Sequence, residues 1–224
     1  MEHLSLLNIL TLAFTLGMLH ALDADHIMAV SSLIGQRPGF VTSLRFCSRW
    51  ALGHGSALLL MGMLVLLLGL TIPPSLSNLF ESLVGVLLIG LGVWVLWKIT
   101  RDRLHLHFHQ HDKQMPHAHW HQRHDTTHTH EHGALFIGVL HGLAGSAPLL
   151  ALLPLTKMDS AWLGLAYLLL FAVGVLAAML LFGGLLGTAI TRLRSLSDRL
   201  LTVLRTVIAF GTIAVGFNLI LRFA

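Results

Sequence analysis

The sequence predicts an all-α, polytopic integral membrane protein with six transmembrane helices, and three observations support this fold class. Of its 224 residues, 55% are hydrophobic and 11% are charged, whereas an ordinary soluble domain has about 25% charged residues. Several apolar runs reach the length of about 20 residues that a helix needs to cross a bilayer. Finally, the two halves of the chain are similar to each other. We therefore expect two sets of three membrane helices.

Six apolar segments are long enough to span the membrane: about 5–34, 50–70, 79–98, 133–153, 161–190 and 200–221. The first and the fifth exceed the length of one straight crossing, so each is expected to tilt strongly, break, or run along the interface. Pro73 and Pro74 end the second segment and Pro154 ends the fourth, because proline lacks the N–H that a helix interior requires.

An internal repeat appears when the sequence is shifted by 121 positions. The stretch Gly17–Leu22 then falls on Gly138–Leu143, and Gly53 falls on Gly174. Because three helices are an odd number, the halves are expected to have inverted topology, a plan that places substrate sites near the membrane midplane. The predicted organisation is a first membrane repeat (1–98), a His-rich loop (99–132) and a second membrane repeat (133–224).

The basic residues predict the orientation in the membrane. Lys and Arg gather in the connections that follow the first, third and fifth segments, whereas the opposite side has only Lys157 and Arg222. By the positive-inside rule the first set is cytoplasmic, so the chain is expected in the inner membrane with both termini outside. Trp50 is then expected at the inner interface. Glu81 is expected at an outward helix end.

Composition also excludes some classes of function. The basic residues are explained by topology, and no basic face with interleaved aromatic residues is present, so a nucleic-acid partner is not expected. The single cysteine, Cys47, cannot form an intrachain disulfide or a C-x-x-C pair, which argues against thiol redox chemistry. We expect neither an enzyme nor a tightly bound cofactor.

The loop from 99 to 132 holds 11 of the 16 histidines, mostly in alternation, as in His105-x-His107-x-His109. Such a tract is typical of disordered, metal-binding segments. Its imidazoles are mostly neutral at cytosolic pH and can bind Ni, Co, Cu or Zn. A solvated polar linker is the alternative interpretation.

The strongest candidate site is His20-Ala-Leu-Asp23-Ala-Asp25-His26, which lies within the first apolar segment. A carboxylate at the centre of a membrane helix costs about 2.5–3.5 kcal/mol, so such residues point to a function. On an ideal helix the four side chains cannot converge. Either the helix is broken around one ion, or one carboxylate does not bind the ion and instead fixes the tautomer of a ligating imidazole. A His–Asp pair that only locks helices together is the alternative.

Two further histidines are candidate ligands. His54 lies on the second segment between Gly53 and Gly55, which allow a neighbouring helix to approach closely. His141 is the repeat counterpart of His20 and precedes a stretch of small residues without a carboxylate. For His54 the alternative is an interhelical hydrogen bond. His141 could also line a pathway without binding metal. The full candidate set for metal binding is His20, Asp23, Asp25, His26, His54 and His141.

The stretch from His20 to His26 resembles the H-x-x-x-x-D-H signature of the nickel/cobalt transporter family, and Leu52-Gly53-His54 resembles that family's next helix motif. The acidic motifs of the family's second half are absent, and His141–Pro148 is instead similar to the short, urease-accessory-like branch of the superfamily. The resemblance implies that His20, Asp25 and His26 govern metal passage.

Together these observations predict a transporter of Ni²⁺ or Co²⁺ as substrate, working in the direction of uptake. Imidazole and carboxylate together suit a divalent transition metal better than Na⁺ or Ca²⁺, which prefer oxygen ligands. Efflux remains open, as does a membrane metallochaperone that delivers nickel to urease or hydrogenase assembly proteins. The sequence does not fix the oligomeric state.

Overall fold

The computed structural model describes residues 6–68, 73–103, 108–109, 117–118, 131–144 and 160–223. Within these ranges the protein is helical apart from one pair of two-residue strands. The helices are α1 (Leu6–His20), α2 (Ala24–Ile34), α3 (Phe40–Leu68), α4 (Pro74–Arg103), α5 (Glu131–Leu143), α7 (Ala161–Leu196) and α8 (Asp198–Phe223). The prediction of an all-α fold is confirmed for the described residues, apart from this pair of short strands.

Three of the described helices are long and apolar enough to cross a membrane, in the ranges Pro74–Arg101, Ala161–Leu196 and Asp198–Phe223. A fourth span is possible by length if α1 and α2, which meet at a bend of 56°, are counted as one broken span. The described part of α5 is shorter. The count of six spans therefore stays a prediction.

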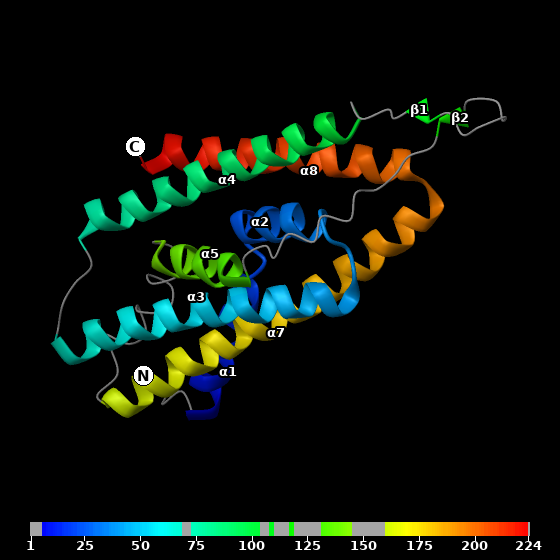
Figure 1. The fold of residues 1–224 in the computed structure, drawn as a ribbon. Coiled ribbons are helices and arrows are strands. Elements are labelled where there is room, and N and C mark those ends of the chain that lie inside the picture. The colour runs from blue at the N-terminus through cyan, green and yellow to red at the C-terminus, as the bar shows by residue number, and fades with distance from the viewer. Residues whose placement is uncertain are drawn as a thin grey trace.

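The helices form three layers, as Figure 1 shows. In one outer layer α4 lies along α8, and in the other α3 crosses α7, with α1 packed against α7. The middle of the molecule holds α2, which contacts α8 and α4, and α5, which packs on α3. The two central helices thus carry their histidines into the interior.

Glycines allow backbones to touch where α1 and α5 meet the long helices. A Cβ on Gly17 would collide with the backbone carbonyl of Phe171 on α7, and a Cβ on Gly138 would collide with that of Trp50 on α3. Each residue of the second pair lies 121 positions from its counterpart in the first. Gly90, in contrast, has open space around its Cβ position.

Several predicted boundaries differ from the structure. The first segment breaks, which was one of the three expected outcomes, whereas α7 runs unbroken over 36 residues. Helix α3 starts at Phe40 rather than near residue 50, because a helix can continue past the apolar stretch into the polar interface. Pro74 opens α4, as its fixed φ angle allows at a first turn.

The His-rich tract contains a local pairing that was not expected. Strand β1 (Phe108–His109) pairs antiparallel with β2 (His117–Ala118), and His109 lies opposite His117. The ends of the predicted loop are helical, because α4 continues to Arg103 and α5 begins at Glu131. Residues 104–107, 110–116 and 119–130 lie outside the described residues, and so does the predicted helical segment beyond 144 up to 153.

Candidate metal centre

The break between α1 and α2 is made by the candidate motif itself. The last turn of α1 tightens, since the Leu22 and Asp23 amides donate to carbonyls three residues back, at 3.0 Å each. Asp23 then occupies the N-cap position of α2 with an extended backbone. An N-cap aspartate usually accepts from the first amides of its helix, but this carboxylate makes no such bond.

The Asp23 carboxylate instead binds His20. Nδ1 of His20 lies 2.7 Å from Oδ2 of Asp23. Since a carboxylate only accepts, Nδ1 carries the proton and the neutral ring keeps its lone pair on Nε2. That Nε2 is buried without a hydrogen-bond partner among the described residues. A carboxylate that orients a ligating imidazole in this way is common at metal sites.

Three imidazoles from three helices meet behind this break. His20, His26 and His54 each contribute one ring nitrogen, and these three nitrogens lie within 4.8 Å of one another. All three side chains are buried. The ring of His26 lies at the centre, 4.6 Å from that of His20 and 5.1 Å from that of His54. Both nitrogens of His54 lack a hydrogen-bond partner in the described structure.

His141 extends the cluster from α5. Its ring lies 5.3 Å from that of His26, but it is not part of the tighter group of three. Nδ1 of His141 donates to the Ile137 carbonyl at 3.0 Å, so the free lone pair again lies on Nε2, which is buried and unpaired among the described atoms. His141 and His20 therefore have the same tautomer, fixed by different acceptors.

Asp25 stands at the rim of the cluster. Its Oδ2 lies 3.0 Å from Nδ1 of His26, although that contact lacks the alignment of a hydrogen bond. The carboxylate side chain is 17% exposed, compared with 45% for Asp23. Asp25 thus supplies a negative charge beside the buried rings without lying among them.

Aromatic side chains form the walls. Trp50 stacks on His54 with ring centroids 5.0 Å apart and contacts His141 at 5.6 Å. Phe171 stacks on His20 at 5.7 Å. The pairs His20–Phe171 and His141–Trp50 are related by the 121-residue offset. The expectation that Trp50 lies at the interface is wrong, because it is fully buried; its position one turn before His54 was the signal for this role.

Helix α8 holds α2 in place. The hydroxyls of Ser32 and Thr212 are 2.7 Å apart and buried, and Nε of Arg205 donates to the Gly35 carbonyl at 2.7 Å. These bonds lie at the end of α2 opposite His26. They fix the helix that carries the central imidazole.

His54 approaches His20 and His26, and neighbouring helices do come close at its flanking glycines, although these helices are α5 and α7. Gly53 packs against the Leu135 carbonyl of α5, and Gly55 lies near Ala172 of α7. The flanking glycines therefore seat α3 on α5 and α7 rather than on the helix that carries the signature. Glu81, expected at an outward helix end, is 4% exposed and thus buried.

The arrangement offers a divalent metal ion three or four imidazole ligands, with the Asp23 carboxylate bonded to His20 and the Asp25 carboxylate beside His26. Buried polar atoms in native proteins nearly always have partners, and leaving one without any costs about 1–3 kcal/mol. A cation is the partner that would satisfy several converging lone pairs at once. No comparable group of three ligands occurs elsewhere in the described ranges.

Comparisons with known proteins agree with a membrane protein of this kind. The family described as "Cytochrome C biogenesis protein transmembrane region" matches residues 27–213. The chain is 36% identical to the urease accessory protein UreH of Bacillus sp. (strain TB-90) over 191 residues, which cover 85% of this chain and 81% of the relative. No solved structure matches the chain. The chain therefore belongs to the family of the urease accessory protein UreH, the urease-accessory-like branch that its signature motifs resemble.

Proposed function

We propose that this protein is a secondary transporter that moves Ni²⁺, or alternatively Co²⁺, across the cytoplasmic membrane into the cell. The observation that supports the proposal most directly is the convergence of His20, His26 and His54 at a break in an apolar segment. A broken helix exposes polar groups at a depth where the bilayer offers no water, and such breaks are typical of substrate sites in transporters.

The chemistry of the cluster favours a transition metal. Imidazole suits Ni, Cu, Zn and Fe, whereas Mg²⁺ and Ca²⁺ prefer oxygen ligands. The name of the urease accessory relative favours nickel among these, since ureases are the context in which that protein is named. We assign His20, His26, His54 and His141 as ligands, Asp23 as the group that orients His20, and Asp25 as the charge beside His26.

The architecture we propose is an inverted repeat of three plus three helices. The glycine contacts Gly17–Phe171 and Gly138–Trp50 support it, as do the ring contacts His20–Phe171 and His141–Trp50. In both cases the contact recurs when 121 is added to the number of the residue in the first repeat and subtracted from that of its partner in the second. The site then lies where the halves meet, near the membrane midplane.

Membrane potential can drive this uptake. With the basic connections and the His-rich loop in the cytoplasm, an inside-negative membrane potential favours entry of a divalent cation by about 4.6 kcal/mol per 100 mV. That free energy corresponds to about 2,000-fold accumulation at equilibrium. The His-rich loop would collect the ion after entry and pass it on, since its histidines are many equivalent ligands.

Sealed vesicles that contain only this protein provide the test. With the interior negative, radioactive nickel should accumulate, and reversing the potential should reverse the flux. The matched variant is His54→Phe, which keeps a ring stacked on Trp50 but removes both nitrogens, and it should abolish accumulation. Export against the potential would instead establish efflux.

A metallochaperone function is the second candidate, and the His-rich tract is the feature that favours it. Such a protein would bind nickel at the membrane and hand it to urease or hydrogenase assembly proteins. Nickel binding to the vesicles without any flux in either direction would identify this function and overturn the transporter proposal.

A further inference from the structure

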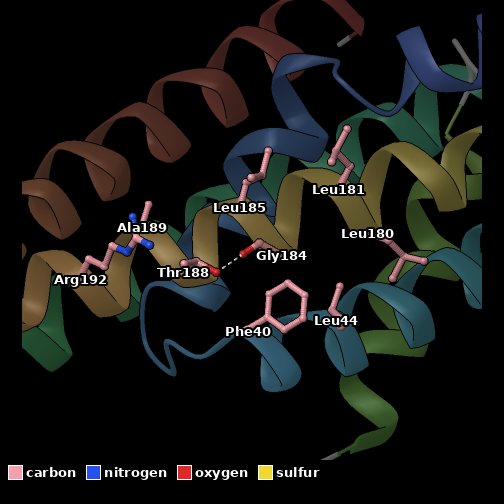
Figure 2. A pocket seen from close by; sticks show the side chains of 9 residues that line it. All are labelled: Phe40, Leu44, Leu180, Leu181, Gly184, Leu185, Thr188, Ala189 and Arg192. Carbon is pink, nitrogen blue, oxygen red and sulfur yellow. Dashed lines mark hydrogen bonds between the residues drawn. The ribbon is translucent and has the colours of Figure 1, made fainter.

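A groove outside the imidazole cluster runs between α3 and α7, with a volume of about 780 Å³. One wall is formed by Phe40 and Leu44, which lie one turn apart on α3, as Figure 2 shows. The other wall is α7 between Leu180 and Arg192. The groove shares no lining residue with the metal centre, so it calls for a separate explanation.

The floor of the groove exists because position 184 is glycine. A Cβ there would lie 3.0 Å from Cε2 of Phe40, so the ring can pack directly on the glycine, and a larger side chain would push Phe40 out into the groove. The hydroxyl of Thr188 donates to the Gly184 carbonyl at 2.8 Å, which Figure 2 shows as a dashed line. Because the Thr188 hydroxyl is bonded within α7, the trough presents an apolar surface.

The length of the groove matches one leaflet of a bilayer. The twelve-residue step from Leu180 to Arg192 extends about 18 Å along a helix axis. Half of the hydrocarbon core is about 15 Å. Leu181 and Leu185 on the rim are 60% and 65% exposed, and in a membrane protein such side chains face lipid.

A positive charge stands at one end of this apolar trough. Arg192 is exposed, and its guanidinium makes no hydrogen bond or ion pair with any residue in the described part of the chain. In Figure 2 it lies at the opposite end of the groove from Leu180. An apolar trough of leaflet depth that ends in a cation complements a molecule with an acyl chain and an anionic head.

We propose that this groove is a specific binding site for a membrane phospholipid. One acyl chain lies in the trough along Leu44 and the α7 surface, over the contact between Phe40 and Gly184, and the headgroup phosphate binds Arg192. Arginine suits this role because its planar guanidinium can donate two parallel hydrogen bonds to a phosphate. The bound lipid would brace α3 against α7, the two helices whose crossing supports His54 and Phe171.

Photo-crosslinking tests the proposal directly. The full-length protein is placed in nanodiscs that contain phosphatidylglycerol with a diazirine in mid-chain, and the labelled positions are mapped by mass spectrometry. We expect labelling concentrated on residues 180–189 and on Phe40, above that of other exposed positions of α7 such as Leu169. Diacylglycerol with the same labelled chain but no phosphate should label these positions less.

Two variants address the two ends of the lipid. Gly184→Leu fills the trough and should remove the labelling. Arg192→Gln should reduce phosphatidylglycerol labelling about fivefold, the ratio that about 1 kcal/mol per basic residue gives, while leaving diacylglycerol labelling unchanged. Matched controls are Val173→Leu on the exposed side of α7 and Arg199→Gln beside the α7–α8 connection, and both should label as the wild type.

If Gly184→Leu fails to fold, Ala189→Leu narrows the groove from its exposed rim and serves in its place. Equal labelling of all exposed helix positions, unchanged by these variants, would mean that only ordinary annular lipid is present and would overturn the proposal. Crosslinks between two copies of the chain at Phe40 or Leu185 would assign the groove to a protein interface instead. Neither outcome bears on nickel transport, so the two proposals fail independently.

Discussion

Replacing Asp23 by alanine tests whether this carboxylate orients His20 for metal binding or only stabilises the fold. The change removes the acceptor that lies 2.7 Å from Nδ1 of His20. It leaves the start of α2 unchanged, because the Asp23 side chain makes no capping bond. His20 is then free to adopt the other tautomer and to rotate, so its lone pair no longer faces His26 and His54.

The size of the effect follows from the exposure of the pair. A hydrogen bond to a charged group contributes about 1.5–3 kcal/mol, and the 45% exposure of the Asp23 side chain places this one at the lower end. A loss of about 1.5 kcal/mol weakens metal binding about tenfold. This value lies at the lower limit of the 10–100-fold range known for groups that orient metal ligands.

The assay is the nickel concentration that gives half-maximal uptake in vesicles, measured together with the melting temperature of the metal-free protein. Asp23→Ala should raise the half-maximal concentration about tenfold with little change in the melting temperature. Asp23→Asn keeps an acceptor oxygen without the charge, so it should fall between the alanine variant and the wild type. A lower melting temperature with unchanged nickel dependence would refute the reasoning and identify a helix-locking pair.

Three further predictions concern other parts of the molecule. Asp25→Asn removes a charge at nearly constant volume and should abolish nickel accumulation in protein that still inserts; uptake at the wild-type level would remove Asp25 from the site. Gly17→Ala and Gly138→Ala should each destabilise the fold by about 1–3 kcal/mol through overpacking, while Gly90→Ala, with open space around it, should not lower the melting temperature. Deleting 105–132 behind a flexible linker should preserve transport at saturating nickel and impair it only when nickel is scarce. Complete loss of transport by a stably inserted deletion variant would place the tract in the pathway.

The local part of the site could be predicted because it is encoded within seven residues. Two carboxylates and two imidazoles in an apolar segment left two interpretations, a broken helix or a carboxylate that fixes an imidazole tautomer. The structure shows the break at residues 21–23, and it also places Asp23 on Nδ1 of His20. The pairing of His20 with Asp23 follows from their spacing of three residues. Such short-range features depend only on helix geometry and on the cost of burying charge.

The long-range part was harder to predict because it depends on how distant helices pack. Trp50 was expected at the interface, but it is covered by α5, which lies more than 80 positions away in the sequence. Glu81 was placed at a helix end by counting apolar residues, yet α4 already begins at Pro74 and Glu81 is buried. Hydropathy finds the part of a helix that lies in the membrane and does not reveal which neighbours cover it.

The transport function that we propose requires ligands that can rearrange, unlike those of a structural metal site. A structural metal site is closed by rigid ligands, but these imidazoles come from α1, α2, α3 and α5, which are joined at a break and at glycine contacts. His26 is the ring shared by the group of three and by His141, so a shift of α2 would move it between two sets of neighbours. The bonds that α8 makes to α2 through Ser32 and Gly35 then define the position from which that shift starts. Substituting Thr212 by valine removes the hydroxyl bonded to Ser32, and it should alter the rate of nickel transport more than the affinity for nickel.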